Sequence, residues 1–351
     1  MTAAYAYELP AELIAQAPAE PRDACRLMVL EGTRPLQHRT FRELGSFLRS
    51  GDLLVLNETR VIAARIFGTR EPTGGKVEFL LLHPAGSQRY SEDAVRWTVL
   101  ARPARRLNAG ERVRFEDARG PLGSATVVET GEGGIRTVAF ELHVTFAQFL
   151  ERGGRLPMPP YVKNDSEAAQ RGYQTVFARV PGSVAAPTAS LHFTPELLAD
   201  LVRNGVELAR LTLDVGLATF RPMQSHRIDG HAMHGESYEI SPGAVRSIVE
   251  AKRDGRRVVA AGTTVVRALE GNVHDNGVLT PGEHVTNVFI TPGFRFQIVD
   301  ALVTNFHLPR STLLVLTSAF AGRERMLDAY AEAVRFGYRF FSFGDAMLVV
   351  P

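Results

Sequence analysis

The residues best suited to chemistry in this 351-residue chain begin with a histidine at the end of a loop of small side chains. Residues 182–193 read Gly-Ser-Val-Ala-Ala-Pro-Thr-Ala-Ser-Leu-His-Phe, which follows neither the helix period of 3.6 nor the strand period of 2. Small residues let the backbone approach a ligand, and an imidazole changes charge near neutral pH. His192 is therefore a candidate acid or base and Thr188 a candidate ligand contact. The alternative is a histidine that only satisfies a hydrogen bond in the core.

A second cluster of titratable residues contains His226, His231, His234 and Glu236. Imidazoles and carboxylates are zinc ligands, but the His-Glu-x-x-His helix pattern is missing and the surrounding Gly, Asp and Pro indicate irregular backbone. We therefore predict no metal. Acid–base or hydrogen-bonding roles for His234 and Glu236 are the preferred interpretation, and a purely structural role is the alternative.

Polar residues follow several apolar runs that have the composition of buried strands. In open α/β sheets, ligands bind beyond the carboxyl ends of the strands. One of these sites has the order strand, glycine, hydroxyl, helix, which leaves free N–H groups for a carboxylate or phosphate. Together with an aspartate in the closing aromatic segment, these positions are the candidate cofactor-binding residues: Asn57, Thr263, Thr264, Asn305, His307 and Asp345.

The densest basic cluster of the chain lies between residues 102 and 114. It contains Arg102, Arg105 and Arg106, with Arg112 and Arg114 close behind. We predict phosphate contacts for the first three of these and for Arg60, which follows the Asn57 strand end. A solvated edge of a β-domain is the alternative.

The elements that must position these residues fall into two groups. From about residue 66 to 151, short strands separated by Gly, Pro and Asn turns predict a small all-β barrel, with strands at 76–82, 96–101, 111–115, 125–129 and 135–142. Residues 1–65 and 152–351 form the predicted α/β domain with a mixed, largely buried sheet, into which the barrel is inserted. Its strands are expected at 27–30, 53–56, 208–215, 257–261, 288–290 and 298–303.

Helix signals occur mainly in the second half of the chain. Thr194-Pro195-Glu196 supplies an N-cap, a proline at the first helical position and an acidic first turn. Helices are expected at 196–204, 265–270, 313–320 and 326–334, with shorter ones after Pro10 and at 41–48.

Composition narrows the class of protein. The net charge is only +2, so any nucleic acid must bind to a local patch. A single cysteine, Cys25, excludes an internal disulfide. Because the sequence has no long apolar run and no secretory signal pattern, we expect no membrane association and a cytoplasmic location. We also expect a monomer.

Several segments taken together, spread over nearly the whole chain, resemble one family, the S-adenosylmethionine:tRNA ribosyltransferase-isomerases of queuosine biosynthesis. At three places the chain departs from the pattern of that family, with Ser190, with Asp214 and Ala218, and with Gly235. The matching segments are 7–10, 20–23, 51–61, 73–78, 182–194, 233–236, 262–267, 305–314 and 342–347.

The resemblance implies an enzyme that uses S-adenosylmethionine as a co-substrate, with no prosthetic group and no metal. Such enzymes transfer and isomerise its ribosyl group onto 7-aminomethyl-7-deazaguanine at the tRNA wobble position, and they release adenine and methionine. The implied partner is that tRNA. Within this scheme, His192 is the leading acid–base candidate, His234 and Glu236 support it, and Thr263 and Thr264 face the methionine carboxylate.

Two other functions fit parts of the sequence. An S-adenosylmethionine-dependent RNA methyltransferase would use the same cofactor, although no strand here is followed by a glycine-rich cofactor loop. A non-catalytic RNA-binding protein would use only the basic cluster. The mass added to the tRNA distinguishes the methyltransferase from a ribosyltransferase, because a methyl group and a ribosyl group differ greatly in mass. Formation of adenine distinguishes the non-catalytic protein from the enzyme.

Overall fold

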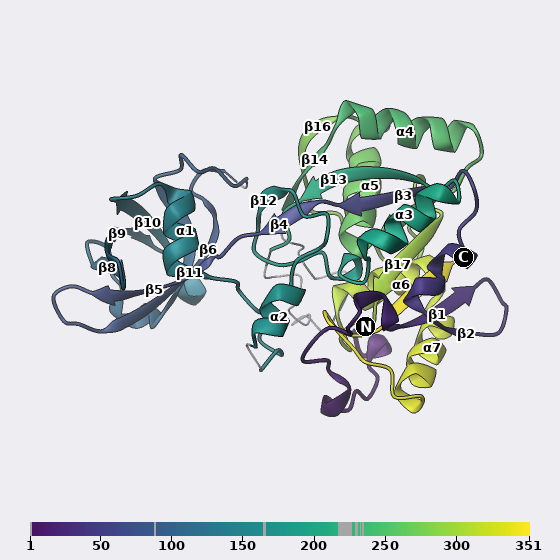
Figure 1. Cartoon of the computed structure of the whole chain (residues 1–351), viewed down its shortest axis with the longest axis horizontal. Coiled ribbons are helices and arrows are strands. Elements are labelled where there is room, and N and C mark those ends of the chain that lie inside the picture. Colours follow the sequence, from purple (N-terminus) through teal and green to yellow (C-terminus); the bar gives the residue numbers. More distant parts are fainter. Residues whose placement is uncertain are drawn as a thin grey trace. The chain divides into compact units, whose positions relative to one another are not determined.

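The computed structural model describes residues 2–87, 89–163, 166–216, 227–228, 231, 233 and 235–351. The chain forms two compact units (Figure 1). The first unit, which we call the main unit, contains residues 1–59, 159–180 and 186–351, and the second, the barrel unit, contains residues 60–158 and 181–185. The barrel unit thus extends on both sides of the insert that the sequence placed at 66–151.

A nine-stranded mixed sheet forms the centre of the main unit, which confirms the predicted fold class. Its middle strands β13, β3, β15 and β17 are parallel, β18 is antiparallel to β17 and parallel to β1, and the edge strands are antiparallel to their neighbours. In spatial order the strands are β16 (Gly282–Thr286), β14 (Glu236–Ile240), β13 (Glu207–Leu213), β3 (Leu53–Asn57), β15 (Val258–Ala261), β17 (Ala301–Asn305), β18 (Ala346–Val350), β1 (Arg26–Glu31) and β2 (Gln37–Thr40).

The apolar run at β3 is buried on both faces because different helices cover each face. Leu54 and Leu56 pack in a core cluster with Phe41 of η4 (Phe41–Ser46) and with α3 (Pro195–Arg203). Successive strand residues point to opposite faces, so Leu53 and Val55 must point to the other one. Helices α4 (Pro242–Arg253) and α5 (Thr263–Asn276) contact β3 as well, and residues 263–273 of α5 are all buried.

The remaining helices complete the main unit. Helix α6 (Thr312–Ala321) packs against α7 (Arg323–Arg335) in the main unit. Strands β4 (Thr59–Val61) and β12 (Val180–Ser183) pair with each other, and most of their residues belong to the barrel unit. The other short elements are η1 (Thr2–Tyr5), η2 (Ala11–Leu13), η3 (Arg22–Ala24), α2 (Glu167–Gly172) and η7 (Thr188–Ser190).

Most elements expected in the main unit are confirmed, but one strand was wrong. The backbone N–H of Val288 donates to the Thr286 hydroxyl at 3.2 Å, and its carbonyl accepts from Arg267 at 3.3 Å. The backbone N–H and C=O of Val288 thus bond to side chains and not to another strand. The strand in this part of the chain is β16, at 282–286. The two short helices expected near residues 11 and 41 are 3₁₀ turns, and helix α4 was not predicted.

The barrel unit is a closed antiparallel barrel, which confirms the predicted all-β fold of the inserted region. Its strands follow the order β11-β5-β6-β7-β10-β9-β8, and β5 also pairs with β8. The aromatic side chains of Phe79, Trp97, Phe115 and Phe149 are fully buried inside. The elements are β5 (Arg65–Arg70), β6 (Lys76–Pro84), β7 (Arg96–Arg102), η5 (Ala104–Arg106), β8 (Arg112–Asp117), β9 (Gly120–Thr130), η6 (Glu132–Gly134), β10 (Ile135–Leu142), α1 (Phe146–Gly153) and β11 (Gly154–Arg155).

The central position of β3 leads to a test of stability. Leu54 is completely buried between Leu208 and Val259 of the neighbouring strands. Leu54→Ala should lower the free energy of unfolding by about 2–5 kcal/mol because it leaves a cavity. Urea denaturation measures this loss. Val249→Ala, on an exposed face of α4, is the control and should change stability by less than about 0.5 kcal/mol.

Candidate active site

A narrow pocket lies beyond the carboxyl end of β17 in the main unit. Its volume is about 30 Å³, and it is formed by residues that are distant in sequence. They come from the end of β17, the short helix η7, the start of α6, the turn before β18 and the segment around residue 161. The lining residues are Tyr161, Thr188, Asn305, Phe306, His307, Leu308, Ser311, Leu313, Phe341 and Ser342.

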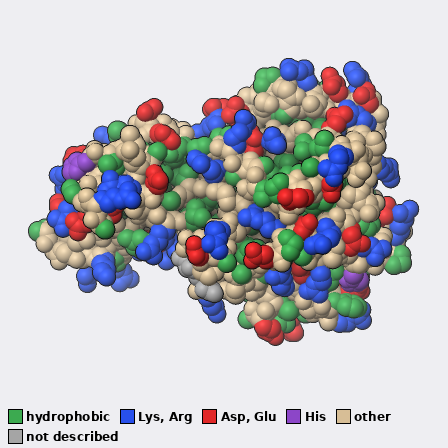
Figure 2. Space-filling view, viewed as in Figure 1, with side chains coloured by type: hydrophobic (Ala, Val, Ile, Leu, Met, Phe, Trp, Pro, Cys, Tyr) green, Lys and Arg blue, Asp and Glu red, His purple; other side chains and the backbone are tan. Residues whose placement is uncertain are grey.

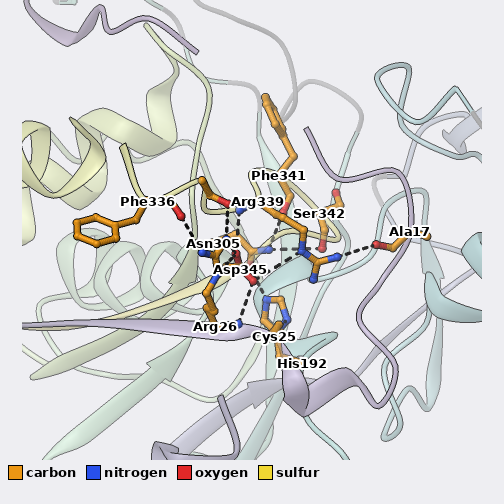
Figure 3. A network of polar contacts seen from close by, with 11 residues as sticks. Ala17, Cys25, Arg26, His192, Asn305, Phe336, Arg339, Phe341, Ser342 and Asp345 are labelled. Carbon is orange, nitrogen blue, oxygen red and sulfur yellow. Dashed lines mark hydrogen bonds and ion pairs between the residues drawn. The ribbon is translucent and has the colours of Figure 1, made fainter. Parts of the chain in front are cut away.

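Asn305 connects three of these segments through its carboxamide (Figure 3). Its Nδ2 donates to the carbonyl oxygens of Phe341 at 2.8 Å and Ser342 at 3.4 Å. Its Oδ1 lies 3.3 Å from His192 Nε2. Because this oxygen can only accept, Nε2 carries the proton, and the other ring nitrogen is an acceptor. The Cys25 thiol, 3.2 Å from Nδ1, is its donor.

Burial determines the charge of His192. The side chain is only 4% exposed and lies against the Phe41 ring, at 5.1 Å between ring centroids. Loss of solvation lowers the pKa of His192 to about 4, and the hydrogen bond to Asn305 opposes this shift. His192 is therefore neutral at pH 7 with both ring nitrogens engaged. This arrangement suits an imidazole that orients Asn305.

His307 is also buried, and it lines the pocket directly. Its Nε2 lies 2.8 Å from the Thr304 hydroxyl, and its backbone N–H donates to Tyr330 at 2.8 Å. Burial lowers the pKa of His307 to about 3. This ring is thus a neutral polar contact at the pocket wall.

Asp345 supports the turn that carries Phe341 and Ser342. Its carboxylate accepts the backbone N–H groups of Arg26 at 2.9 Å and Arg339 at 2.8 Å, and it forms an ion pair with the Arg26 guanidinium at 2.9 Å (Figure 3). Asp345 does not line the pocket. Its contacts instead fix the ends of the turn against β1.

The start of α5 lies against the same loop. Gly262 has a φ of +106°, and a Cβ built on it would lie 3.7 Å from Ala189 of η7. Thr263 and Thr264 follow in the first turn of α5 and are buried. The loop at 186–193, the first turn of α5 and the end of β17 are thus close together.

Six described residues that the sequence assigned to catalysis or cofactor binding are absent from the pocket lining: Asn57, His192, Glu236, Thr263, Thr264 and Asp345. The Asn57 side chain is bonded to both the N–H and the carbonyl of Leu213, each at 3.0 Å, so it joins β3 to β13. Glu236 is buried in an ion pair with Arg267 of α5. His234 and Ala218 lie outside the described residues.

Several residues that line the pocket were not among the predicted site residues, including Tyr161, Ser311, Phe341 and Ser342. The Tyr161 hydroxyl lies 2.5 Å from the Ser342 hydroxyl, and its ring centroid lies 4.5 Å from that of Phe341. Ser311 caps α6, its hydroxyl accepting the N–H of Leu314 at 3.2 Å. The N-cap was visible in the sequence as a helix start, but no local pattern placed Tyr161 beside residue 342.

The basic residues assigned to RNA are exposed in the barrel unit. They are Arg60 at its beginning, Arg102 at the end of β7, and Arg105 and Arg106 in η5. In the view of Figure 2, Lys and Arg side chains are spread over the left part of the surface.

Over residues 2–87, 89–163, 166–216 and 235–351, together with the few described positions between 227 and 233, no group of three His, Cys, Asp or Glu side chains could hold a metal ion. In the same part of the chain, no helix is both long and apolar enough to cross a bilayer.

The low pKa of His192 predicts a specific dependence of stability on pH. Its folded pKa, about 4, is below the ordinary value of 6.5, so the unfolded chain binds this proton more readily. Stability contributed by neutral His192 is therefore complete above pH 6.5 and is lost as pH falls toward 4. Between pH 7 and pH 5 the loss should be about 2 kcal/mol from this residue.

Urea denaturation of wild type and His192→Gln at both pH values measures this effect. The variant should lose less stability on acidification than wild type does. His274→Gln, at an exposed position of α5, is the control and should keep the wild-type dependence. An identical slope for His192→Gln and wild type would contradict the assignment.

Comparison with known proteins identifies the family. The model of the queuosine biosynthesis protein family matches residues 2–349. S-adenosylmethionine:tRNA ribosyltransferase-isomerases of Heliobacterium modesticaldum and Symbiobacterium thermophilum are each 51% identical, over 99% and 98% of both chains. A crystal structure of an S-adenosylmethionine tRNA ribosyltransferase from Thermotoga maritima is 39% identical, with a TM-score of 0.54 over 99% of this chain and 100% of that one. The chain belongs to the queuosine biosynthesis protein family.

Proposed function

We propose that this protein is an S-adenosylmethionine:tRNA ribosyltransferase-isomerase. It transfers and isomerises the ribosyl moiety of S-adenosylmethionine onto 7-aminomethyl-7-deazaguanine at the tRNA wobble position. The products are epoxyqueuosine-tRNA, adenine and methionine. The observation that carries this proposal is similarity along the whole chain, at about half identity, to proteins with that name. We expect the enzyme to act as a monomer in the cytoplasm.

The reaction needs acid–base groups and a binding site for each part of the cofactor. The positive sulfonium acidifies the adjacent ribose carbon, so a base can remove a proton there. Ring opening then expels adenine, the tRNA amine attacks the ribosyl fragment, and closure of the epoxide expels methionine. Each proton transfer by a positioned side chain typically contributes 10²–10⁴-fold to the rate.

The pocket beside Asn305 has the surface that a purine needs. Tyr161 and Phe341 provide aromatic walls, and Thr188 and Ser342 provide hydrogen-bonding edges. At about 30 Å³ it is too narrow for adenine as it stands, so we infer that the Tyr161 or Phe341 ring moves when the cofactor binds. Movement of side chains is common on ligand binding.

For the methionine carboxylate we propose the start of α5. The N–H groups of Thr263 and Thr264 belong to the first turn of a 14-residue helix, whose partial positive charge favours an anion. The closeness of Gly262 to Ala189 supports binding of both ends of the cofactor in one region.

His192 remains the leading acid–base candidate from the sequence, with His234 and Glu236 as supporting candidates. Its hydrogen bonds to Cys25 and Asn305 also support a second role, in which His192 positions Asn305 and does not exchange a proton with substrate. Two substitutions separate these roles, because glutamine can replace the hydrogen bonds of an imidazole but not its acid–base chemistry.

Release of adenine from S-adenosylmethionine in the presence of the modified tRNA tests the function and the role of His192. Wild type should release one adenine for each ribosylated tRNA, as determined by mass spectrometry. His192→Ala should lower the rate at least 100-fold in either role. Recovery to within about 10-fold of wild type by His192→Gln would support positioning, whereas no recovery would support proton transfer. A folded His192→Ala with the wild-type rate would remove this residue from the mechanism.

The barrel arginines give an independent prediction about tRNA. Arg105→Glu with Arg106→Glu should weaken tRNA binding and flatten its dependence on salt, because fewer counterions are released when fewer phosphates are contacted. Fluorescence anisotropy at several salt concentrations measures both quantities. A second double variant, Glu129→Gln with Glu132→Gln, is the control for surface changes elsewhere on the barrel and should not flatten the slope. An unchanged slope for the arginine variant would exclude these contacts.

A further inference from the structure

A second concave surface lies on the outside of the barrel unit, on strands β5, β6, β7 and β8. It has a volume of about 590 Å³ and is formed entirely by barrel residues. Its lining combines one aromatic ring with basic side chains: Phe67, Gly68, Thr69, Lys76, Val77, Glu78, Arg102, Pro103, Arg114 and Glu116. The proposed chemistry of the main unit does not use this surface, which we call the barrel groove.

The register of the strands places the groove side chains in two rows. Phe67 of β5 lies opposite Glu78 of β6, and Glu78 lies opposite Arg102 of β7. Thr69 lies opposite Lys76 on one side and Arg114 on the other. Residues that are directly opposite in a sheet point to the same face. The ring and the cations are therefore held side by side by hydrogen-bonded strands.

Phe67 is an unusual residue to find on this face. Its side chain is 46% exposed, although the other large aromatic rings of the barrel strands are buried. The Arg155 guanidinium lies over the ring, 5.4 Å from its centroid, and provides its partner on one side. A flat ring on a rigid strand, with a cation beside it, is a suitable platform for stacking a nucleic-acid base.

The charge of the groove favours a polyanion. Its two carboxylates have arginine partners: Glu78 lies 3.4 Å from Arg65, and Glu116 lies 3.6 Å from Arg114. In the described part of the chain, no carboxylate forms an ion pair with Lys76, Arg102 or Arg155. Residues 60–158 contain fifteen Lys and Arg against eleven Asp and Glu, so they are more basic than the whole chain, whose net charge is +2.

We propose that the barrel groove binds single-stranded RNA, with Phe67 stacking on one unpaired base and Lys76, Arg102 and Arg155 contacting the flanking phosphates. That the RNA is a tRNA anticodon loop rests on the proposed function. A single aromatic ring among unpaired cations favours RNA over a protein partner, since the centres of protein interfaces are depleted in charged residues. Unpaired bases are also what proteins stack on aromatic side chains when they bind RNA.

Binding of two labelled RNAs to the full-length protein tests this proposal without catalysis. One probe is a synthetic anticodon stem-loop with guanine at the wobble position, and the other is a fully paired RNA duplex of equal length. Phe67→Ala should weaken stem-loop binding by about 5- to 100-fold, the range for loss of one stacked base, and should leave duplex binding unchanged. Phe67→Trp should retain the affinity.

Two further variants complete the experiment. Val95→Ala removes another exposed apolar side chain of the barrel, 66% exposed and outside the groove, and should bind both RNAs like wild type. Arg102→Gln should weaken the binding of both RNAs and lower the slope of log affinity against log salt by about 1. Because Phe67 and Arg102 are exposed, neither substitution should unfold the barrel, which thermal denaturation verifies.

Three results would overturn the proposal. In the first, Phe67→Ala binds the stem-loop with the affinity of wild type. In the second, Phe67→Ala loses the same affinity for the stem-loop and for the duplex. In the third, the wild-type protein self-associates, and Phe67→Ala abolishes this self-association while its RNA affinity is unaltered. The last result would make the groove a contact between copies of this chain. Failure of the proposed function has a different signature, in which wild type binds the stem-loop through Phe67 but releases no adenine with the modified tRNA.

Discussion

The candidate site depends on the hydrogen bonds of the Asn305 carboxamide. Its two donors hold the carbonyls of Phe341 and Ser342, and its oxygen meets His192. A buried amide left without partners costs about 1–3 kcal/mol for each unsatisfied group, so the turn, the loop and the strand end stabilise one arrangement together. The same contacts fix the tautomer of His192 and direct its other nitrogen toward Cys25. The geometry of the pocket therefore follows from one side chain at the end of β17.

This constraint can operate because the surrounding sheet is rigid. Asn305 is the last residue of β17, whose five residues are all buried, and the turn it binds is fixed by Asp345 to the start of β1. Hydrogen bonds to a charged acceptor are stronger than those between neutral groups. Asp345 thus contributes to the site at a distance, by setting the shape of the turn. Asn57 similarly stabilises the main sheet, where it joins two parallel strands.

The two units differ in the physical character of their polar residues. In the main unit, burial keeps His307 in the pocket wall and His192 beside it uncharged, and the polar groups around Asn305 bond to one another. The barrel unit has the opposite character, with exposed arginines and one exposed ring on well-paired strands. A nucleic acid is bound better by solvated cations, because binding of its phosphates releases counterions. Burying such cations in a core would carry a free-energy penalty for their desolvation, so a buried pocket suits a small organic ligand better.

Most strands and helices, and the resemblance to the family, could be predicted from local patterns in the chain. A run such as Leu53–Leu56, apolar at every position, predicts a strand buried on both faces, and Thr194-Pro195-Glu196 predicts the start of α3; both signals act over a few residues. The strand expected at 288–290 was wrong because its backbone groups bond to Thr286 and Arg267, and Arg267 belongs to a different element.

Which polar residues contact one another became clear from the packing of the folded chain. Cys25 and His192 are 167 positions apart, and Asn305 lies 36 positions before Phe341, so no local period relates them. The structure also distinguishes two residues that look equivalent in the sequence. Asn57 and Asn305 each end an apolar strand, but of these two only Asn305 lines the pocket. The physical reason is that hydrophobic periodicity records which face of an element is buried, whereas the partner of a polar side chain depends on how distant elements pack.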